Sequence, residues 1–246
     1  MRLLFDIGNT LTKIGIKKDG KLTKYRIATN TELTEDELYL KIRPYIEGMD
    51  IQEIGVSSVV PEMTMLLKSM IEKYFEVEPI IVGPGVKTGL RVIAEYPGEV
   101  GADLVCDAVG SFKYGKTVLV IDLGTAIKYL MVDNQTLTGV VISPGIETSV
   151  SALVENTALL PDFEIKIPPR VLGNNTIHCL QSGITYGVAA QIEGMVKRIE
   201  KEIGKTFEIV LSGGFSTLLS EVLCLDVHVN KMLVLEGLDE IMNKNI

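Results

Sequence analysis

Two short turns in the sequence combine residue types that can hold a polyphosphate. The first reads Asp6-Ile-Gly-Asn-Thr10 and the second reads Asp122-Leu-Gly-Thr-Ala126, and each turn follows an apolar run. A carboxylate at the end of a buried strand can hold a metal ion or a water molecule beside a phosphate chain. The turn amides and a threonine hydroxyl can then donate to phosphate oxygens. The two turns are therefore candidates for a polyphosphate site.

A strand that ends in Asp and Gly is also a common hairpin signal, so one such turn alone carries little information. Here the segment 4–8 overlays the segment 120–124, which indicates an internal duplication of a strand–Asp–turn–strand unit. A third element, the pair Gly213 and Gly214, follows a predicted strand and precedes a predicted helix. Glycines at such a turn allow the backbone to approach a base or a ribose closely.

The segment 110–117 matches the Walker A phosphate-binding pattern at every defined position. A working Walker A loop follows a strand and opens a helix, so that its amides and the helix N-terminus converge on the phosphates. Here the preceding stretch 102–112 has a helical pattern, and the following stretch 118–122 is a predicted strand. We therefore do not expect this segment to bind phosphate.

The elements that must position these turns form two similar halves. Thr34 and Glu37 form the signature of a capping box, and Pro61 occupies a favoured first position of a helix. The predicted strands cover residues 2–7, 13–17, 22–27, 54–60, 79–82, 118–122, 127–132, 137–142, 207–211 and 226–229. Predicted helices begin at Thr34 and Pro61 and cover residues 183–203, 216–223 and 236–244. We expect two α/β domains with mixed sheets, 1–115 and 116–246, whose Asp turns face each other across a cleft.

The composition excludes several classes of protein. The 246 residues are 46% hydrophobic and 23% charged, with a formal net charge of −8. An acidic chain without a basic run is unsuited to nucleic acid or to an anionic membrane, and no apolar run approaches the roughly 18 residues of a membrane span. Three widely spaced cysteines and two histidines exclude a disulfide framework and a zinc ribbon. The early Asp6 leaves no apolar signal-peptide core, so we expect a cytoplasmic protein.

The two Asp turns and the Gly-Gly turn together resemble the superfamily of acetate and sugar kinases, Hsp70 and actin, which pairs two RNase H-like domains around ATP. Within it, the sequence resembles the type III pantothenate kinases along nearly the whole chain. The matching segments are Asp6-Ile-Gly-Asn-Thr10, Gly55-Val-Ser-Ser-Val-Val-Pro61, Pro97-Gly-Glu-Val-Gly-Ala-Asp103, Asp122-Leu-Gly-Thr-Ala126, Ser143-Pro-Gly-Ile146, Thr157-Ala-Leu-Leu-Pro161, Gly173-Asn-Asn-Thr176 and Leu233-Val-Leu-Glu-Gly-Leu238.

The resemblance implies ATP-dependent phosphorylation of pantothenate to 4'-phosphopantothenate, the first step of coenzyme A biosynthesis. It implies Mg²⁺ at Asp6 and a monovalent cation, K⁺ or NH₄⁺, at Asp122. The ATP contacts that it implies come from Asp6, Gly8, Asn9, Thr10, Lys13, Thr125, Gly213 and Gly214.

The resemblance also implies a pantothenate pocket formed by Gly101, Ala102, Asp103, Leu104 and Thr176. Asp103 would be the general base on the primary hydroxyl, and Thr176 would reach pantothenate across a homodimer interface. Phosphoryl transfer needs mainly positioning, cations and one proton acceptor, so this machinery is chemically sufficient. The helix 183–203, which carries an apolar stripe, is expected at or near the dimer interface.

Each of these residues also has a purely structural explanation. Asp103 is suited to the first turn of a helix, Thr176 to a helix N-cap, and Lys13 to the outer side of a strand. Cys106 follows Asp103 on an apolar face and is expected in the core rather than as a nucleophile.

The sequence departs from the family pattern near the expected site. Leu104 stands where the family usually has Arg, which removes a fixed cation. Ile127 and Lys128 replace two threonines after the second Asp turn, and Ala94 replaces a tyrosine of the pantothenate pocket. Lys128 either returns a positive charge to the site or points away from it. Two alternatives to a pantothenate kinase therefore remain: a kinase of the same fold for another small hydroxy acid, and a catalytically silent nucleotide-binding regulatory paralogue.

Overall fold

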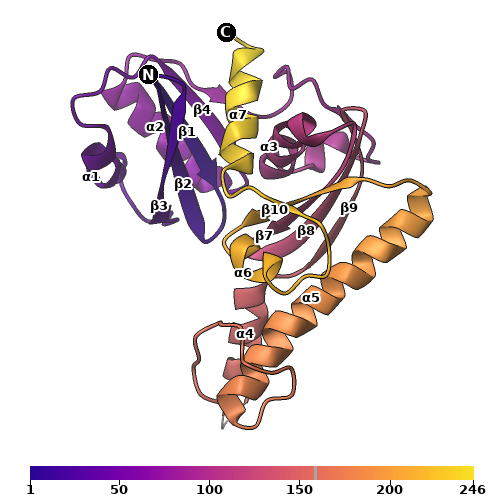
Figure 1. Cartoon of the computed structure of the whole chain (residues 1–246). Helices are drawn as coiled ribbons and strands as arrows, with labels where there is room; N and C mark the ends of the chain where they lie inside the picture. Colours follow the sequence, from indigo (N-terminus) through magenta and orange to yellow (C-terminus); the bar gives the residue numbers. More distant parts are fainter. Residues whose placement is uncertain (158–159) are drawn as a thin grey trace. The chain divides into compact units, whose positions relative to one another are not determined.

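The computed structural model describes residues 1–157 and 160–246 (Figure 1). These residues form two compact units. The first unit comprises Met1–Lys113, Gln135–Leu137 and Met232–Ile246, and the second comprises Tyr114–Asn134 and Thr138–Lys231. The family motif expected at 157–161 includes residues 158 and 159, which lie outside the described residues.

The first unit contains a mixed five-stranded sheet in the order β3-β2-β1-β4-β5. Its strands are β1 (Arg2–Ile7), β2 (Leu11–Lys18), β3 (Lys21–Ala28), β4 (Glu53–Ser58) and β5 (Ile80–Ile81). β1 pairs antiparallel with β2 and parallel with β4. Asp19 and Gly20 join β2 to β3 with φ angles of 50° and 77°, as a tight hairpin turn requires.

Helices cover both faces of this sheet. α1 (Glu35–Ile46) and α2 (Pro61–Tyr74) pack in one core with Leu3, Phe5 and Ile7 of β1. α3 (Ala102–Ser111) and α7 (Leu233–Asn243) pack in a second core with Leu4. From Leu3 to Ile7, β1 is apolar except at Asp6. Because successive strand residues point to opposite faces, Asp6 belongs with Leu4 to the α3 and α7 side. The capping box predicted at Thr34 and Glu37 is present at the start of α1.

α3 and α7 approach each other closely through two glycines. A Cβ atom on Gly237 would lie 1.8 Å from the carbonyl oxygen of Cys106, and one on Gly110 would lie 2.6 Å from the carbonyl oxygen of Leu233. No side chain fits at either position without separating the helices. Gly110 therefore has a packing role, and the Walker-like segment that begins there follows a helix and precedes a strand, as the sequence predicted.

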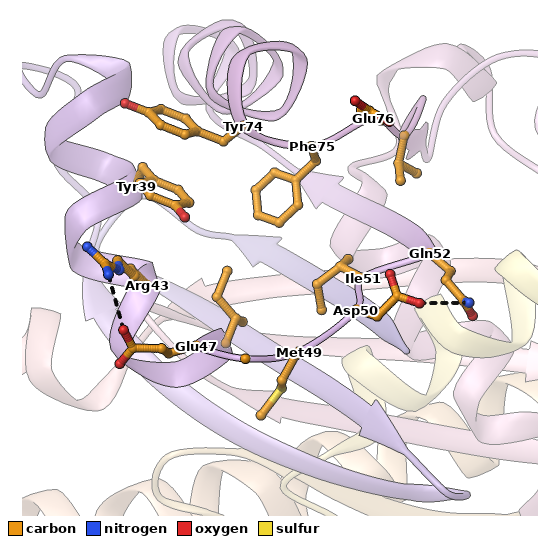
Figure 2. Close-up of a pocket in the computed structure, with 13 residues that line it drawn as sticks. Tyr39, Arg43, Glu47, Met49, Asp50, Ile51, Gln52, Tyr74, Phe75 and Glu76 are labelled. Atoms are coloured by element: carbon orange, nitrogen blue, oxygen red, sulfur yellow. Dashed lines mark hydrogen bonds and ion pairs between the residues drawn. The ribbon is translucent and has the colours of Figure 1, made fainter.

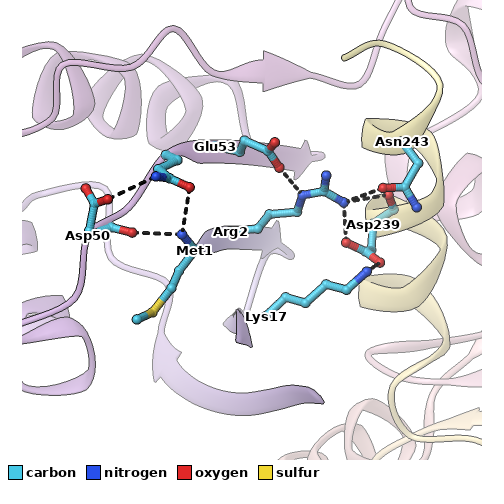
Figure 3. A network of polar contacts seen from close by, with 8 residues as sticks. Met1, Arg2, Lys17, Asp50, Glu53, Asp239 and Asn243 are labelled. Carbon is cyan, nitrogen blue, oxygen red and sulfur yellow. Dashed lines mark hydrogen bonds and ion pairs between the residues drawn. The ribbon is translucent and has the colours of Figure 1, made fainter. Parts of the chain in front are cut away.

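A network of charges holds α7 against the sheet of the first unit (Figure 3). Arg2 donates to Glu53 of β4 at 2.6 Å and to Asn243 of α7 at 2.8 Å. Asp239 of α7, 7% exposed, accepts from both Arg2 and Lys17. The sequence placed all residues after Lys116 in the second domain, whereas the structure places the C-terminal segment with the first unit. Burial of the apolar side of α7 on α3 and β1 accounts for this difference.

Within the described residues, the second sheet has the strand order β11-β10-β7-β8-β9-β6, and all of its strands except β6 and the first residues of β9 belong to the second unit. These are β7 (Thr117–Leu123), β8 (Ala126–Asp133), β9 (Thr136–Pro144), β10 (Glu208–Gly213) and β11 (His228–Val229). β7 pairs antiparallel with β8 and parallel with β10, so the second unit repeats the mixed pairing of the first. The short strand β6 (Arg91–Val92) pairs with the first residues of β9, which belong to the first unit.

Among its described residues, the second unit also contains the helices α4 (Ile146–Glu155), α5 (Thr176–Ile203) and α6 (Ser216–Ser220). Ile146, Ile192 and Leu219, one from each helix, are buried in a common core with β7, β8 and β10. The sequence predicted only the part of α5 from residue 183 onward and did not predict α4. Figure 1 shows the N-terminal half of α5 extending beyond the sheet beside α4.

Two short 3-10 helices, η1 (Pro97–Glu99) and η2 (Phe112–Tyr114), flank α3. No helix within the described residues combines the length and the apolar character that crossing a membrane requires.

Candidate functional site

The first Asp turn presents a buried carboxylate with two partners. Asp6, 4% exposed, is the next-to-last residue of β1 and lies opposite Lys13 of β2 and beside Ser57 of β4. The ammonium of Lys13 lies 2.8 Å from Oδ2 of Asp6, and the hydroxyl of Ser57 donates to Oδ1 at 3.1 Å. Lys13 therefore points toward the turn and is not an outward strand residue. Sequence reasoning did not single out Ser57 as a partner of Asp6.

The backbone of this turn is held in place by the start of β2 and by the residue that follows β3. The amide of Gly8 donates to the carbonyl oxygen of Leu11 at 3.1 Å, and the hydroxyl of Thr29 donates to the carbonyl oxygen of Gly8 at 2.7 Å. Asn9 and Thr10 are exposed at the tip. The turn thus combines a fixed backbone with exposed polar side chains beside a carboxylate–ammonium pair.

The second Asp turn repeats this arrangement. Asp122, 6% exposed, is the next-to-last residue of β7 and lies opposite Lys128 of β8. The ammonium of Lys128 lies 2.7 Å from Oδ2 of Asp122. The carbonyl oxygen of Thr125 accepts from the amide of Gly145 at 3.1 Å and from the hydroxyl of Thr148 at 2.7 Å. The start of α4 therefore supports this turn.

The Gly-Gly turn lies beside the second Asp turn because β10 and β7 are parallel neighbours. Gly213 has a φ of 90°, and a Cβ atom there would lie 2.4 Å from the carbonyl oxygen of Leu123. A Cβ atom on Gly214 would meet no atom within 4 Å. The structure therefore brings Asp122, Gly213 and Gly214 together within the second unit.

Asp103 lies in the first turn of α3, and its Oδ1 accepts from the amide of Leu104 at 2.9 Å. Cys106, one turn further along, is fully buried. Burial and the nearby Asp6 carboxylate raise the pKa of its thiol well above the ordinary value, opposed by a hydrogen bond with Ser57. Cys106 is therefore a core residue, as predicted. It links α3, which carries Asp103, to the Asp6 turn within the first unit.

Gly101, the N-cap of α3, leaves room for the Asp103 carboxylate. A Cβ atom there would lie 2.5 Å from Oδ1 of Asp103. We expect Gly101→Ala to displace this carboxylate. For the general base that the sequence resemblance implies at Asp103, an error near 1 Å would lower kcat by about 10- to 100-fold. The melting temperature should change little because the displaced atom ends a side chain.

The matched control for this variant is Gly98→Ala, whose added Cβ atom would meet nothing within 4 Å in the same loop. Steady-state kinetics and thermal melts of both variants provide the measurement. An unchanged kcat in Gly101→Ala would show that the position of Asp103 does not govern the rate.

Thr176 is the first residue of α5 and is exposed. The N-cap is Asn175, whose side chain accepts from the amide of His178 at 2.9 Å. Thr176 therefore does not cap α5, and the structural explanation offered for it as an N-cap does not apply. Gly173 packs against this first turn, where a Cβ atom would lie 2.5 Å from the amide nitrogen of Cys179. Thr176 belongs to the second unit, whereas Asp103 belongs to the first.

The four departures from the family pattern have different surroundings. Ile127 is fully buried in the core of the second unit, and Lys128 pairs with Asp122. Leu104 is partly buried on α3, and Ala94 is exposed in the segment before η1. Within the described residues no three His, Cys, Asp or Glu side chains gather into a metal site.

The first unit also has a pocket of about 680 Å³ that contains none of the predicted site residues (Figure 2). Tyr39 and Tyr74 stack there with ring centroids 3.9 Å apart, beside the loop that leads into β4. The pocket therefore lies at the amino end of β4, whereas Asp6 lies at the carboxyl end of the parallel strand β1. Open α/β sheets bind ligands at the carboxyl ends of their strands, so this pocket is not the expected kinase site.

Known proteins similar to this chain belong to the family that its sequence resembles. A sequence model of the type III pantothenate kinases matches residues 2–198. The type III pantothenate kinase of Acholeplasma laidlawii is 44% identical over 247 residues, and that of Halalkalibacterium halodurans is 40% identical over 255 residues; each comparison covers all of both chains.

Among solved structures, a ROK family glucokinase from Streptomyces griseus superposes with a TM-score of 0.50 at 14% sequence identity. The match covers 98% of each chain. Similarity at this level of identity bears on the fold alone, and it confirms the predicted actin-like α/β fold with two mixed sheets flanked by helices.

Proposed function

The chain belongs to the type III pantothenate kinase family, and from this premise we infer which of its residues transfer a phosphoryl group from ATP to pantothenate in coenzyme A biosynthesis. The observation that carries the inference is the duplicated carboxylate–lysine pair. Asp6 and Asp122 each lie opposite a lysine, one residue before the end of a buried strand, and the turn that follows each strand has an exposed polar tip.

We propose that both Asp turns bind the phosphates of ATP and that Gly213 and Gly214 lie against the adenosine. Gly8, Asn9 and Thr10 supply donors from the first turn, and Thr125 supplies donors from the second. The side chain of Lys13 is 28% exposed, so its ammonium can turn from Asp6 to a phosphate oxygen. Stabilisation of phosphate charge by fixed cations is the main requirement of phosphoryl transfer.

Mg²⁺ fits the first turn as a partner of the nucleotide once Lys13, whose side chain is more exposed than that of Lys128, has turned from Asp6 to a phosphate oxygen. Because no three ligand side chains gather within the described residues, phosphate oxygens would supply most of its ligands and Asp6 the protein ligand. Bound there, Mg²⁺ would neutralise charge on the transferred group. At the second turn Lys128 already lies on Asp122, so the carboxylate does not fit the expected K⁺ or NH₄⁺.

Asp103 is proposed to accept the proton of the primary hydroxyl of pantothenate. As this proton moves to the carboxylate, the hydroxyl oxygen bonds to the γ-phosphorus of ATP, and the bond from that phosphorus to the bridging oxygen of ADP breaks. Gly101, Ala102 and Leu104 surround Asp103 at the start of α3 and are proposed to contact the substrate. The carboxylates of Asp6 and Asp103 both act electrostatically on the buried Cys106 thiol, and this proximity to a common residue supports the role.

A homodimer is proposed from exposed apolar side chains of the second unit. Ile142 of β9 is 64% exposed, Leu153 of α4 is 39% exposed, and Leu172, just before α5, is 84% exposed. A second chain that covers Leu172 would lie near Thr176 at the start of α5, in agreement with the proposed contact of Thr176 to pantothenate. We also propose a cytoplasmic location, since coenzyme A biosynthesis consumes ATP and the three cysteines are free thiols.

The function is tested by ADP release from ATP and Mg²⁺ with and without pantothenate. We expect release that depends on pantothenate, and phosphopantothenate formed in equal amount. Nucleotide binding without stimulation by pantothenate would contradict the assignment. A panel of other small hydroxy acids would then separate a changed substrate from a catalytically silent protein.

A further inference from the structure

The second Asp turn differs from the family pattern in having a lysine on its carboxylate. Lys128 is a sequence departure, and its ammonium lies 2.7 Å from Oδ2 of Asp122. The pair is well shielded, with side-chain exposures of 17% for Lys128 and 9% for Asp122. The ammonium is therefore a part of this turn and not a surface charge.

The position of Lys128 is fixed by its neighbours in β8. Ile127 and Tyr129 are almost fully buried in the core of the second unit. Because successive strand residues point to opposite faces, Lys128 must point to the face away from this core. Asp122 is its direct partner in the β7–β8 register and shares that face.

The first turn has the same construction with a different spacing. Lys13 follows Asp6 by seven residues, whereas Lys128 follows Asp122 by six, yet the strand register places each lysine opposite its aspartate. Both turns thus balance the buried carboxylate with a covalently attached cation.

We propose that Lys128 supplies at Asp122 the positive charge for which the family resemblance implies K⁺ or NH₄⁺, so that this kinase turns over without an added monovalent cation. An ammonium group and a potassium ion carry the same charge, and a second cation on the same shielded carboxylate would be repelled. The inference rests on the proposed function, because the charge at Asp122 matters only if this turn binds the phosphates of ATP.

The test compares pantothenate-dependent ADP release in tetramethylammonium chloride and in KCl or NH₄Cl at equal ionic strength. Wild-type enzyme is expected to show no specific activation by K⁺ or NH₄⁺. Lys128→Thr, which restores the residue type usual in the family, is expected to lose about tenfold or more of its activity in tetramethylammonium chloride and to regain activity in KCl.

Thermal melting provides a second readout that does not depend on turnover. With a non-hydrolysable ATP analogue bound, the Tm of Lys128→Thr should rise specifically in KCl, because a ligand that binds only the folded state stabilises it. The Tm of wild-type enzyme should be equal in the two salts. The matched control is Lys205→Thr in the same unit. It removes an ion pair in which the ammonium of Lys205 lies 2.7 Å from Oδ2 of Asp133. Its salt response should equal that of wild type.

The outcomes distinguish a failure of the role of Lys128 from a failure of the proposed function. Wild-type turnover that requires K⁺, with a Tm rise specific to K⁺, overturns the role of Lys128 even if the variant does not fold. A Lys128→Thr enzyme that is fully active in tetramethylammonium chloride also overturns it. Absence of pantothenate-dependent turnover in every salt contradicts the proposed function instead.

Discussion

Asp103→Asn is expected to reduce kcat for pantothenate by a factor of about 10² to 10⁴, the usual contribution of a positioned general base. The amide oxygen of Asn can still accept from the amide of Leu104, as Oδ1 of Asp103 does at 2.9 Å, so the fold of α3 is preserved. The KM for pantothenate should change much less than kcat, since Asn keeps the shape of the side chain. Steady-state ADP release at saturating ATP and Mg²⁺ measures both parameters.

Glu99→Gln is the matched control for this variant. Glu99 is an exposed carboxylate in η1, a few residues before Asp103, and its loss should leave kcat within about twofold, as surface changes away from a site usually do. If Asp103→Asn retained full kcat and showed only a raised KM, Asp103 would be a binding residue and the proton acceptor would lie elsewhere.

Gly237→Ala is expected to destabilise the protein by about 3 kcal/mol, the upper part of the range for overpacked cores. Its Cβ atom would lie 1.8 Å from the carbonyl oxygen of Cys106 and 2.9 Å from the amide nitrogen of Gly110. Both contacts are with backbone, so α7 and α3 must move apart. The free energy of unfolding, measured by urea denaturation, tests this expectation.

Gly187→Ala makes the same chemical change in α5, where the added Cβ atom would meet nothing within 4 Å. Because Ala favours a helix over Gly, this control should be stabilised by up to about 1 kcal/mol. Equal effects of the two substitutions would show that the α3–α7 contact is looser than the structure indicates.

The parts of the fold that the sequence predicted are those encoded by local patterns. The capping box at Thr34, the hairpin turn at Asp19-Gly20 and the repeated Asp turns are all signals that span a few residues, and each is present. Lys13 lies opposite Asp6 because the first Asp turn joins β1 to β2 in a local antiparallel hairpin.

The parts that were missed depend on contacts between distant residues. Ser57 pairs with Asp6 across 51 residues, and no local pattern identifies it. Strand alternation left the direction of Lys128 open, because that direction depends on which side of β8 the core of the second unit occupies. The packing role of Gly237 depends on α3, which lies far earlier in the chain.

Because α7 belongs to the first unit, the unit whose synthesis begins first is the last to be completed. Asp239 contacts Arg2 across 237 residues, so at about 5–20 residues per second Arg2 waits roughly 10 to 50 s for this partner. Every segment of the second unit precedes Met232 and is therefore made before α7. During that interval the apolar face formed by Leu4 and α3 lacks its cover and is a natural target for a chaperone on the nascent chain.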